Sequence, residues 1–464
     1  MSTFSPTRDV QSLAKSEMKT ESQLTLSQLS LSGLLSRESL QYEGKGTFFT
    51  SVFTLTNSAV GAGILAFPYA FSQCGLAMGM GLTVAFSAIM GYTAVVLAAS
   101  TAHAQQLSPR SNVRSYQDVA RVLVGPRLEA AVIFTMSIFL FGSCIGYLVV
   151  IGDMTDPIVA PLFKDTSLAN ESRRCMIATL GILVLLPLCL LPRVSMLGFT
   201  SLLSVISVVY IVGVVCVDAM LGRQQDGTAW HKADGVEMVR GIDGIFLCIP
   251  LLCLALHCHS FVPIIYSEIE LSQRTLPFMN RVIAYSMTIC TLLYLPVGAF
   301  GYYRFGSLTP QDVLTGYDSG NAAITLATMG ITCTVTFCFP ICHFAVCTAM
   351  FSHGRRTGLW SEAVPLHDKR ADLMIPHRFQ RREAVLFVGS AMAVAMYARS
   401  LATIFGLFSA TCGSLVIFIY PALFLSKLPC RGSLLWHNAR IALLLFVGGS
   451  IMIVGTAVTL LHIL

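Results

Sequence analysis

Long runs of apolar residues, separated by shorter polar connections, occupy most of this 464-residue chain. A helix needs about 20 apolar residues to cross a bilayer. Because an unpaired backbone is too costly in lipid, such runs indicate an all-α polytopic membrane protein. By this measure we expect eleven transmembrane helices, at residues 48–71, 76–100, 128–152, 175–192, 195–221, 243–266, 282–303, 322–351, 384–400, 402–425 and 441–463.

The first apolar run contains residues that a helix with no other task than crossing lipid would avoid. Gly61, Gly63 and Pro68 lie inside it. A glycine costs about 1 kcal/mol in a helix interior and a proline about 3 kcal/mol. Broken helices at membrane depth are tolerated only where the freed backbone is buried or lines a cavity. There, opened N–H groups can bind a carboxylate and opened carbonyls a cation, so this run predicts a binding site near the middle of the membrane.

The sixth run is also interrupted by polar residues. His257, His259, Ser260 and Pro263 stand in a segment that is otherwise rich in Leu, Ile and Cys. Pro263 lacks a backbone donor and should free carbonyls one turn earlier, at about residues 255–259. A kinked structural helix is the alternative interpretation. Two interrupted runs at corresponding places in two halves of a chain favour a transporter site instead.

The distribution of charge limits the kind of solute. Charged residues make up only 12% of the chain, its mean hydropathy is +0.71, and no Asp, Glu, Lys or Arg lies in the middle of an expected span. Since a charged solute normally requires a fixed counter-charge, the site favours a neutral or zwitterionic solute. Sodium coupling needs only neutral oxygens, whereas proton coupling needs a titratable group, for which His257 and His259 are candidates. Without a Walker sequence or a His-Glu-x-x-His motif, neither ATP-driven pumping nor enzyme activity is expected.

Residues 1–46 differ from the rest of the chain. They are rich in Ser and Thr, with five basic and five acidic residues, and are expected to be a disordered cytosolic tail ahead of an eleven-helix domain at 47–464. With the N-terminus in the cytosol, 22 Lys and Arg lie inside and 8 outside, as the positive-inside rule requires. The only glycosylation sequon, at Asn170, then falls outside. A disulfide between Cys74 and Cys175 stays open as a possibility.

Several motifs resemble one known family. Residues 57–71 look like the first-helix motif of the sodium-coupled neutral amino acid transporters, within the amino acid/auxin permease group. Residues 258–268 are similar to the sixth-helix motif of that family. Further resemblances lie at residues 141–153, 303–314 and 339–344.

The resemblance implies a fold and a set of roles. The fold would have eleven helices in a 5+5 inverted repeat, like the bacterial leucine transporter, with discontinuous helices 1 and 6. The amides of residues 61–63 would bind the substrate carboxylate, and carbonyls near residues 256 and 257 its ammonium group. The expected substrate-binding residues are Ser58, Gly61, Ala62, Gly63, Ile64, Leu256, His257, His259 and Ser260, and the expected sodium ligands are Asn57, Val60, Thr332 and Thr334.

We therefore expect a secondary active transporter of a small neutral amino acid, with sodium symport favoured. A proton-coupled carrier and an amino acid sensor that signals through the N-terminal tail are the alternatives. The expected coupling ion is Na⁺ or H⁺, with no cofactor, and the expected partners are the amino acid and membrane lipid, with no nucleic acid. The protein is expected to be a monomer in the plasma membrane or in a vacuolar or lysosomal membrane.

Overall fold

The structure is a computed structural model that describes residues 44, 46–108, 113–159, 171–191, 197–225, 235–317, 320–358, 375–398, 400–430 and 432–461. The tail predicted at residues 1–46 lies almost entirely outside the described residues, and so does Asn170.

The described chain is helical, and its only β-type contact is one isolated bridge between Gly46 and Ile269. The helices are α2 (Phe48–Ala59), η1 (Ala62–Ala66), α3 (Phe67–Cys74), α4 (Leu76–Leu107), α5 (Tyr116–Leu123), α6 (Pro126–Val159), α7 (Ser172–Leu180), η4 (Gly181–Leu185), α8 (Leu186–Leu190), α9 (Leu197–Gln225), α10 (Ile242–Ala255), η5 (His259–Phe261), α11 (Val262–Glu268), α12 (Leu276–Phe305), η6 (Gly306–Leu308), η7 (Val313–Gly316), α13 (Ala322–Arg356), α14 (His377–Tyr397), α15 (Leu401–Phe408), η9 (Ser409–Gly413), η10 (Leu415–Ile419), α16 (Tyr420–Leu425), α17 (Leu434–Ser450), η11 (Ile451–Gly455) and α18 (Thr456–Leu461).

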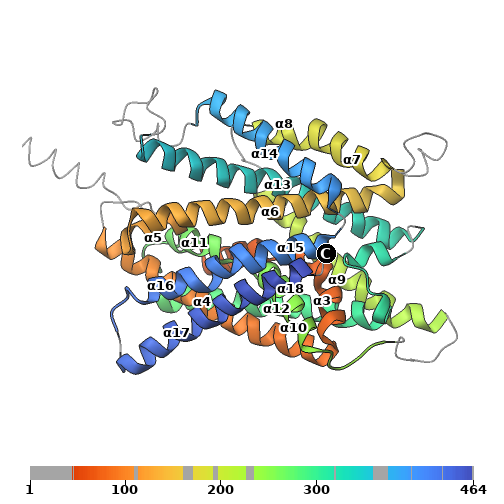
Figure 1. Cartoon of the computed structure of the whole chain (residues 1–464), viewed down its shortest axis with the longest axis horizontal. Coiled ribbons are helices and arrows are strands. Elements are labelled where there is room, and N and C mark those ends of the chain that lie inside the picture. The colour runs from red at the N-terminus through yellow and green to blue at the C-terminus, as the bar shows by residue number, and fades with distance from the viewer. Residues whose placement is uncertain are drawn as a thin grey trace, which may run out of the picture.

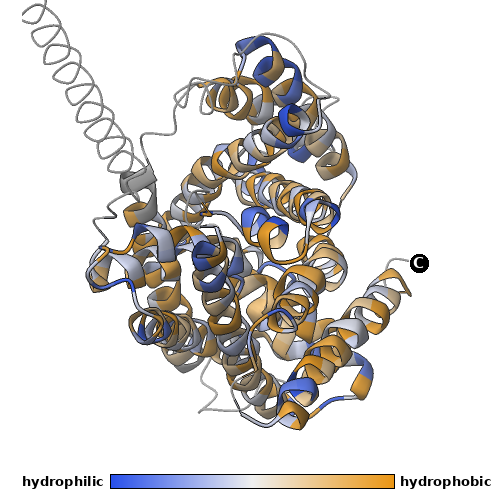
Figure 2. Cartoon of the chain, turned by 90° about the vertical axis from the view of Figure 1, so that its left-hand side faces the viewer, coloured by the Kyte–Doolittle hydropathy of each residue, from blue (hydrophilic) through white to orange (hydrophobic). Residues whose placement is uncertain are grey.

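Consecutive elements combine into helical stretches that are suited to a membrane. Within the described residues, nine such stretches are long and apolar enough to span it, and the bent pair Phe48–Ala59 and Ala62–Cys74 makes up to ten. Figure 2 looks along the helices and shows apolar residues over most of the ribbon. The remaining expected span, 384–400, corresponds to α14, which has 21 residues but begins with several charged ones. An eleventh span therefore stays a prediction.

The long helices lie roughly side by side, as Figure 1 shows for α4, α6 and α13. Helix α4 packs on α12, while α6 packs on α13, α14 and α15. Helices α7, α8, α13 and α14 form the upper part of the view in Figure 1, next to α6. Thus α14 lies against α6, and α13 lies against both α6 and α9.

Close packing around α3 depends on two glycines. The ring of Phe71 is fully buried, and a Cβ atom built on Gly79 or Gly298 would lie 2.7 or 2.9 Å from that ring. A neighbouring ring, Phe67, packs on Tyr294 of α12 with ring centroids 4.7 Å apart. Since interiors are as dense as crystals, side chains at these glycines would push α3 away from α4 and α12.

The structure does not contain the disulfide that the sequence left open. Cys74 and Cys175 are both free, and the Cys74 thiol lies beside that of Cys248 in the middle of α10. The pairing was suggested by their places on expected helices, and the actual packing gives Cys74 a different neighbour.

Candidate functional site

The first span is interrupted after Ala59. Helix α2 ends there, Val60 and Gly61 adopt extended conformations, and the 3₁₀ turn η1 starts at Ala62 and continues into α3. No side chain caps the N-terminus of η1. The first N–H groups of a helix have no partner within it, so the amides of Ala62 and Gly63 form an uncapped donor set, and the amide of Gly61 next to them lies against the hydroxyl of Tyr294.

Proline placement helps to start the second half of each interrupted span. Pro68 lies in the first turn of α3 and Pro263 in the first turn of α11. A proline there costs no intrahelical hydrogen bond and has the required φ angle. Pro263 is therefore a helix start rather than a kink inside a helix, and the break that it follows lies one turn upstream.

That second break separates α10 from η5. Helix α10 ends at Ala255, and residues 256–258 leave the helical path before η5 begins at His259. The last carbonyls of a helix lack intrahelical partners, so the end of α10 presents acceptors at this depth. Apolar side chains surround these acceptors, among them Leu252 and Leu256, which are both fully buried.

The two breaks meet at Gly63 and Ala255. A Cβ atom on Gly63 would lie 2.8 Å from the Cβ atom of Ala255, so only glycine allows η1 to approach the end of α10 this closely. A Cβ atom on Gly61 would meet nothing within 4 Å, which leaves open space beside the uncapped amides. The donors of one break and the acceptors of the other thus lie close together, with room next to Gly61.

The two histidines of the second break are held by hydroxyl groups. Nε2 of His259 is hydrogen-bonded to Oγ1 of Thr93 at 2.8 Å, and Nε2 of His257 to Oγ of Ser260 at 2.9 Å. The two imidazole rings stack with centroids 5.5 Å apart. His257 also contacts the ring of Phe139 on α6, at 4.9 Å between centroids. These contacts fix both rings and tie the break to α4 and α6.

The other predicted substrate-binding residues have different surroundings. Ala62, Gly63, Ile64, Leu256 and His259 are buried, whereas Ser58, Gly61 and Ser260 are half-buried. The hydroxyl of Ser58 donates to the carbonyl of Leu55 within α2. Its polar hydrogen is therefore already used inside the helix, and Ser58 has less to offer a ligand than the backbone of residues 61–63.

Of the predicted sodium ligands, Asn57 lies on α2 and Val60 in the break that follows it, whereas Thr332 and Thr334 lie on α13. The side-chain oxygens of Asn57 and of its neighbour Thr56 are buried and have no hydrogen-bond partner. Thr334 is buried on α13, and the hydroxyls of Thr332 and Thr334 each donate to a carbonyl four residues earlier. Helix α2 packs mainly on α12, whereas α13 packs mainly on α6 and α9. Unpartnered oxygens are thus present near the first break, and the hydroxyls of Thr332 and Thr334 are bonded within α13.

Sequence reasoning missed several residues that shape these breaks. Thr93 of α4 and Phe139 of α6 hold the histidines, and the hydroxyl of Tyr294 on α12 donates to the carbonyl of Ala59 at 2.9 Å. Thr93 could have been suspected from the sequence only weakly, as a polar residue inside an apolar run. Phe139 and Tyr294 could not have been found in this way, because aromatic residues are common in such runs.

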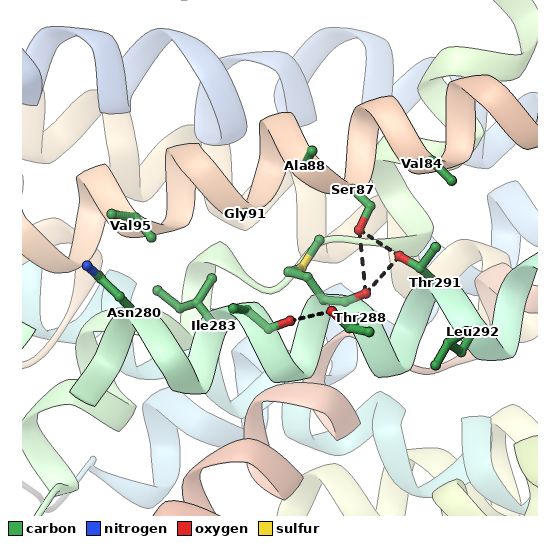
Figure 3. A pocket seen from close by; sticks show the side chains of 12 residues that line it. Val84, Ser87, Ala88, Gly91, Val95, Asn280, Ile283, Thr288, Thr291 and Leu292 are labelled. Carbon is green, nitrogen blue, oxygen red and sulfur yellow. Dashed lines mark hydrogen bonds between the residues drawn. The ribbon is translucent and has the colours of Figure 1, made fainter. Parts of the chain in front are cut away.

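A cavity between α4 and α12 is a poor candidate for the site. It has about 400 Å³ and lies between α4 and α12, where Figure 3 shows Ser87 and Thr291 hydrogen-bonded to each other across its wall. Its other labelled side chains are mostly aliphatic. It is lined by neither break. In the part of the chain that the structure describes, no group of three or more His, Cys, Asp or Glu could hold a metal ion.

Comparison with known proteins gives a family and a fold. Residues 44–461 match the family model described as transmembrane amino acid transporter protein. The sodium-coupled neutral amino acid transporter 7 of Danio rerio is 31% identical over 306 residues, covering 63% of this chain and 62% of that protein. Solute carrier family 38 member 10 of Mus musculus is 28% identical over 415 residues, covering 88% of this chain and 35% of that protein. The chain thus spans less than two thirds of the length of these curated relatives.

Two solved structures share the fold. MhsT in complex with L-phenylalanine superposes with a TM-score of 0.57 at 13% identity, covering 90% of this chain and 99% of that one. Mhp1, a nucleobase-cation-symport-1 family transporter with bromovinylhydantoin bound, gives 0.54 at 13% identity, covering 91% and 92%.

Proposed function

We propose, from the premise that this chain belongs to the transmembrane amino acid transporter family, that it carries a neutral amino acid across a membrane by secondary active transport. The single observation that supports this most is the close approach of the two interrupted spans at Gly63 and Ala255. In other proteins, paired broken helices bind small zwitterions between their ends. The chain is accordingly proposed to be a transporter and not an enzyme.

The proposed binding mode uses the backbone. The substrate carboxylate accepts hydrogen bonds from the amides of Gly61, Ala62 and Gly63, at the positive end of η1 and α3. The substrate ammonium group donates to carbonyls at the end of α10, near Leu256 and His257. His257, His259 and the hydroxyl of Ser260 form a neutral, hydrogen-bonded wall beside this space. A wall without a fixed charge favours a neutral side chain on the substrate.

Sodium symport is the proposed form of coupling. Two buried oxygens next to the first break, Oδ1 of Asn57 and Oγ1 of Thr56, have no partner. An unpartnered buried acceptor is costly, and a bound cation would relieve that cost. The carbonyl of Val60 and the hydroxyls of Thr332 and Thr334 complete the proposed ligand set. Several curated relatives carry sodium coupling in their names.

Finer features of the fold and its location are proposed with this function. The breaks fall in the first spans of two successive halves, which supports the 5+5 inverted repeat. Helix α14 would be the eleventh span, and the charge bias along the chain supports a cytosolic N-terminus. The proposed protein works as a monomer in the plasma membrane or in a vacuolar or lysosomal membrane, with Asn170 on the outer side.

Flux measured with purified protein tests the proposal. Proteoliposomes containing the full chain are given radiolabelled glutamine or alanine, with sodium present or replaced by choline. We expect uptake that exceeds that of empty vesicles and that requires sodium. Uptake that persists in choline and collapses without a pH gradient would replace sodium by protons. Binding without any flux would contradict the carrier and support a sensor.

A further inference from the structure

A buried pair of titratable side chains joins α13 to α14, away from both breaks. Nε2 of His343 on α13 is hydrogen-bonded to Oε2 of Glu383 on α14. The side chain of His343 is 1% exposed and that of Glu383 is 12% exposed. Sequence reasoning placed Glu383 just ahead of a span, but α14 begins six residues earlier, at His377, so the carboxyl lies along the helix.

The surroundings of the pair contain little else that could balance a charge. The thiols of Cys347 on α13 and Cys189 on α8 face Glu383, and the ring of Phe387 covers His343 with centroids 5.3 Å apart. The side-chain amide of Gln380, three residues before Glu383 on α14, donates to the carbonyls of Cys189 and Leu191. The basic residues at the start of the same helix are exposed, namely His377, Arg378, Arg381 and Arg382.

Helix α6, which packs on both α13 and α14, also faces this region with neutral groups. The thiol of Cys342, next to His343 in the chain, is hydrogen-bonded to Cys144 and Tyr147 of α6. The neighbouring titratable groups on α6, α8 and α13 are thus thiols and a phenol. His343 and Glu383 must balance each other's charge.

Electrostatics then gives the pair two distinct forms. When the pair holds one titratable proton, its net charge is zero. The proton then lies either on the imidazole, which gives a contact ion pair, or on the carboxyl group, which gives two neutral groups. When that proton leaves to water, a carboxylate remains against a neutral imidazole, with a net charge of −1. A buried charge without a partner is strongly unfavourable, particularly inside a membrane. The two forms of the pair therefore differ by one unit of net charge at a position where both side chains are largely shielded from water.

We propose that His343 and Glu383 form a proton-binding site between α13 and α14, and that occupation of this site by a proton is coupled to the transport cycle. The second part rests on the proposed function. The proton adds to Nε2 of His343 or to Oε2 of Glu383 and leaves to water by the same atoms, so that no other bond changes.

Helix α6 contacts both the pair and the candidate substrate site through aromatic rings. The ring of Phe387 contacts His343 and also Phe141 of α6, with the latter centroids 5.2 Å apart. Two residues before Phe141, Phe139 contacts His257 at the second break. A shift of α6 against α13 and α14 would disturb both sites at once, which is a physical route for coupling.

The histidines of the substrate site are less suited to this task. His257 and His259 are paired with the hydroxyls of Ser260 and Thr93. A hydroxyl can serve a neutral imidazole as donor or acceptor, but it supplies no negative charge to stabilise an imidazolium. The carboxylate of Glu383 supplies that charge to His343.

Proton movement during uptake tests the proposal. The full chain is reconstituted into proteoliposomes that contain a pH-sensitive dye, and labelled glutamine uptake is followed from pH 5.5 to 8.5 with equal pH on both sides. For a single coupled proton, we expect substrate-dependent proton movement and a rate that changes by up to about tenfold per pH unit. Glu383→Gln should abolish the proton movement and flatten the pH profile. His343→Gln should do the same. The exposed His377→Gln on the same helix is the matched control and should behave like wild type.

Each outcome bears on the pair. Wild-type proton movement and pH profile in a folded Glu383→Gln or His343→Gln protein would overturn the proposal, and so would substrate uptake by wild type without proton movement. If wild type takes up no amino acid at any pH, the proposed function fails by itself. In that case, infrared difference spectra of the solubilised wild type and Glu383→Gln, recorded between low and high pH, test the proton site without transport. A pH-dependent carboxyl band that is lost in Glu383→Gln supports the proton site, and identical spectra overturn it.

Discussion

The hydroxyl of Tyr294 donates a hydrogen bond to the carbonyl oxygen of Ala59, the last residue of α2 before the first break, at 2.9 Å. The two residues are 235 positions apart in the chain. Tyr294 is fully buried on α12, so the bond satisfies a carbonyl that the break has left without an intrahelical partner. One side chain of α12 thus supports the open backbone of the first span.

Tyr294→Phe should weaken both stability and substrate binding. A buried carbonyl left unsatisfied costs about 1–3 kcal/mol, so we expect a lower melting temperature and a several-fold weaker affinity for the amino acid. Thermal unfolding in detergent and binding of labelled glutamine measure the two effects. Tyr285→Phe on the exposed side of the same helix is the control. Equal affinity in wild type and Tyr294→Phe would show that the bond does not support the site.

Gly63→Val should prevent η1 from packing on α10. Even the Cβ atom of alanine would lie 2.8 Å from the Cβ atom and 2.9 Å from the Cα atom of Ala255, and neither contact can be relieved by rotating a side chain. We expect loss of substrate binding in a protein that still inserts into the membrane, as measured by uptake and by surface or membrane expression. Gly81→Ala on α4, where a Cβ atom meets nothing within 4 Å, should remain active.

Gly61→Val should act by another route. The space beside Gly61 is open, so the protein should fold with a stability close to that of wild type. If that space receives the substrate carboxylate, the branched side chain fills it, and the affinity should fall at least tenfold while the melting temperature stays unchanged. Normal affinity in this variant would place the carboxylate elsewhere.

Asn57→Ala and Thr334→Ala should raise the sodium concentration needed for half-maximal uptake. Each removes a proposed oxygen ligand or a group that positions one, and a cation at this depth needs its hydration replaced by nearby oxygens. Uptake measured over a range of sodium concentrations gives the shift. Thr336→Ala is the control, because its hydroxyl makes the same bond to its own helix from a different face. An unchanged sodium requirement in both variants would remove these residues from the ligand set.

Asp312 should make stability depend on pH. Burial raises the pKa of its carboxyl to about 7, and the nearby Asp153 carboxylate raises it as well. The hydrogen bond from the N–H of Leu314 acts in the opposite direction and lowers this pKa. An unfolded Asp titrates near about 3.9. Between these values the folded state binds the extra proton, so stability should fall as pH rises from about 4 to about 7 and level off above, by about 1.4 kcal/mol per pH unit at most.

Asp312→Asn checks that sign. Asn keeps an oxygen that can accept the hydrogen bond from Leu314, but its amide does not titrate. The melting temperature of the variant should therefore change less between pH 5 and 7 than that of wild type. At pH 8 the difference in melting temperature should shift in favour of the variant. Asp243→Asn, at an exposed position, should leave the wild-type curve in place. Parallel curves for wild type and Asp312→Asn would contradict the raised pKa.

Local composition was enough to predict the type of fold and the position of the two breaks. Apolar runs longer than a bilayer is thick can only be spanning helices, since lipid offers no partner to the backbone. Gly61, Gly63 and Pro68 mark the first break because each opposes a continuous helix wherever it stands. The start of α14 was less clear, since its charged first turns conceal a helix that begins at His377.

Which side chains meet was decided only by the tertiary structure. The partners of His259, His343 and Ala59 are 166, 40 and 235 residues away, and the free thiol of Cys74 lies by Cys248 rather than by Cys175. Such pairs depend on the rotation and depth of each helix, which side-chain packing between helices sets. An apolar run that faces lipid on one side and protein on the other carries little record of its rotation, because both surroundings accept the same residues. The sequence therefore determined that helices cross a membrane and where two of them break, and packing determined what lies beside the breaks.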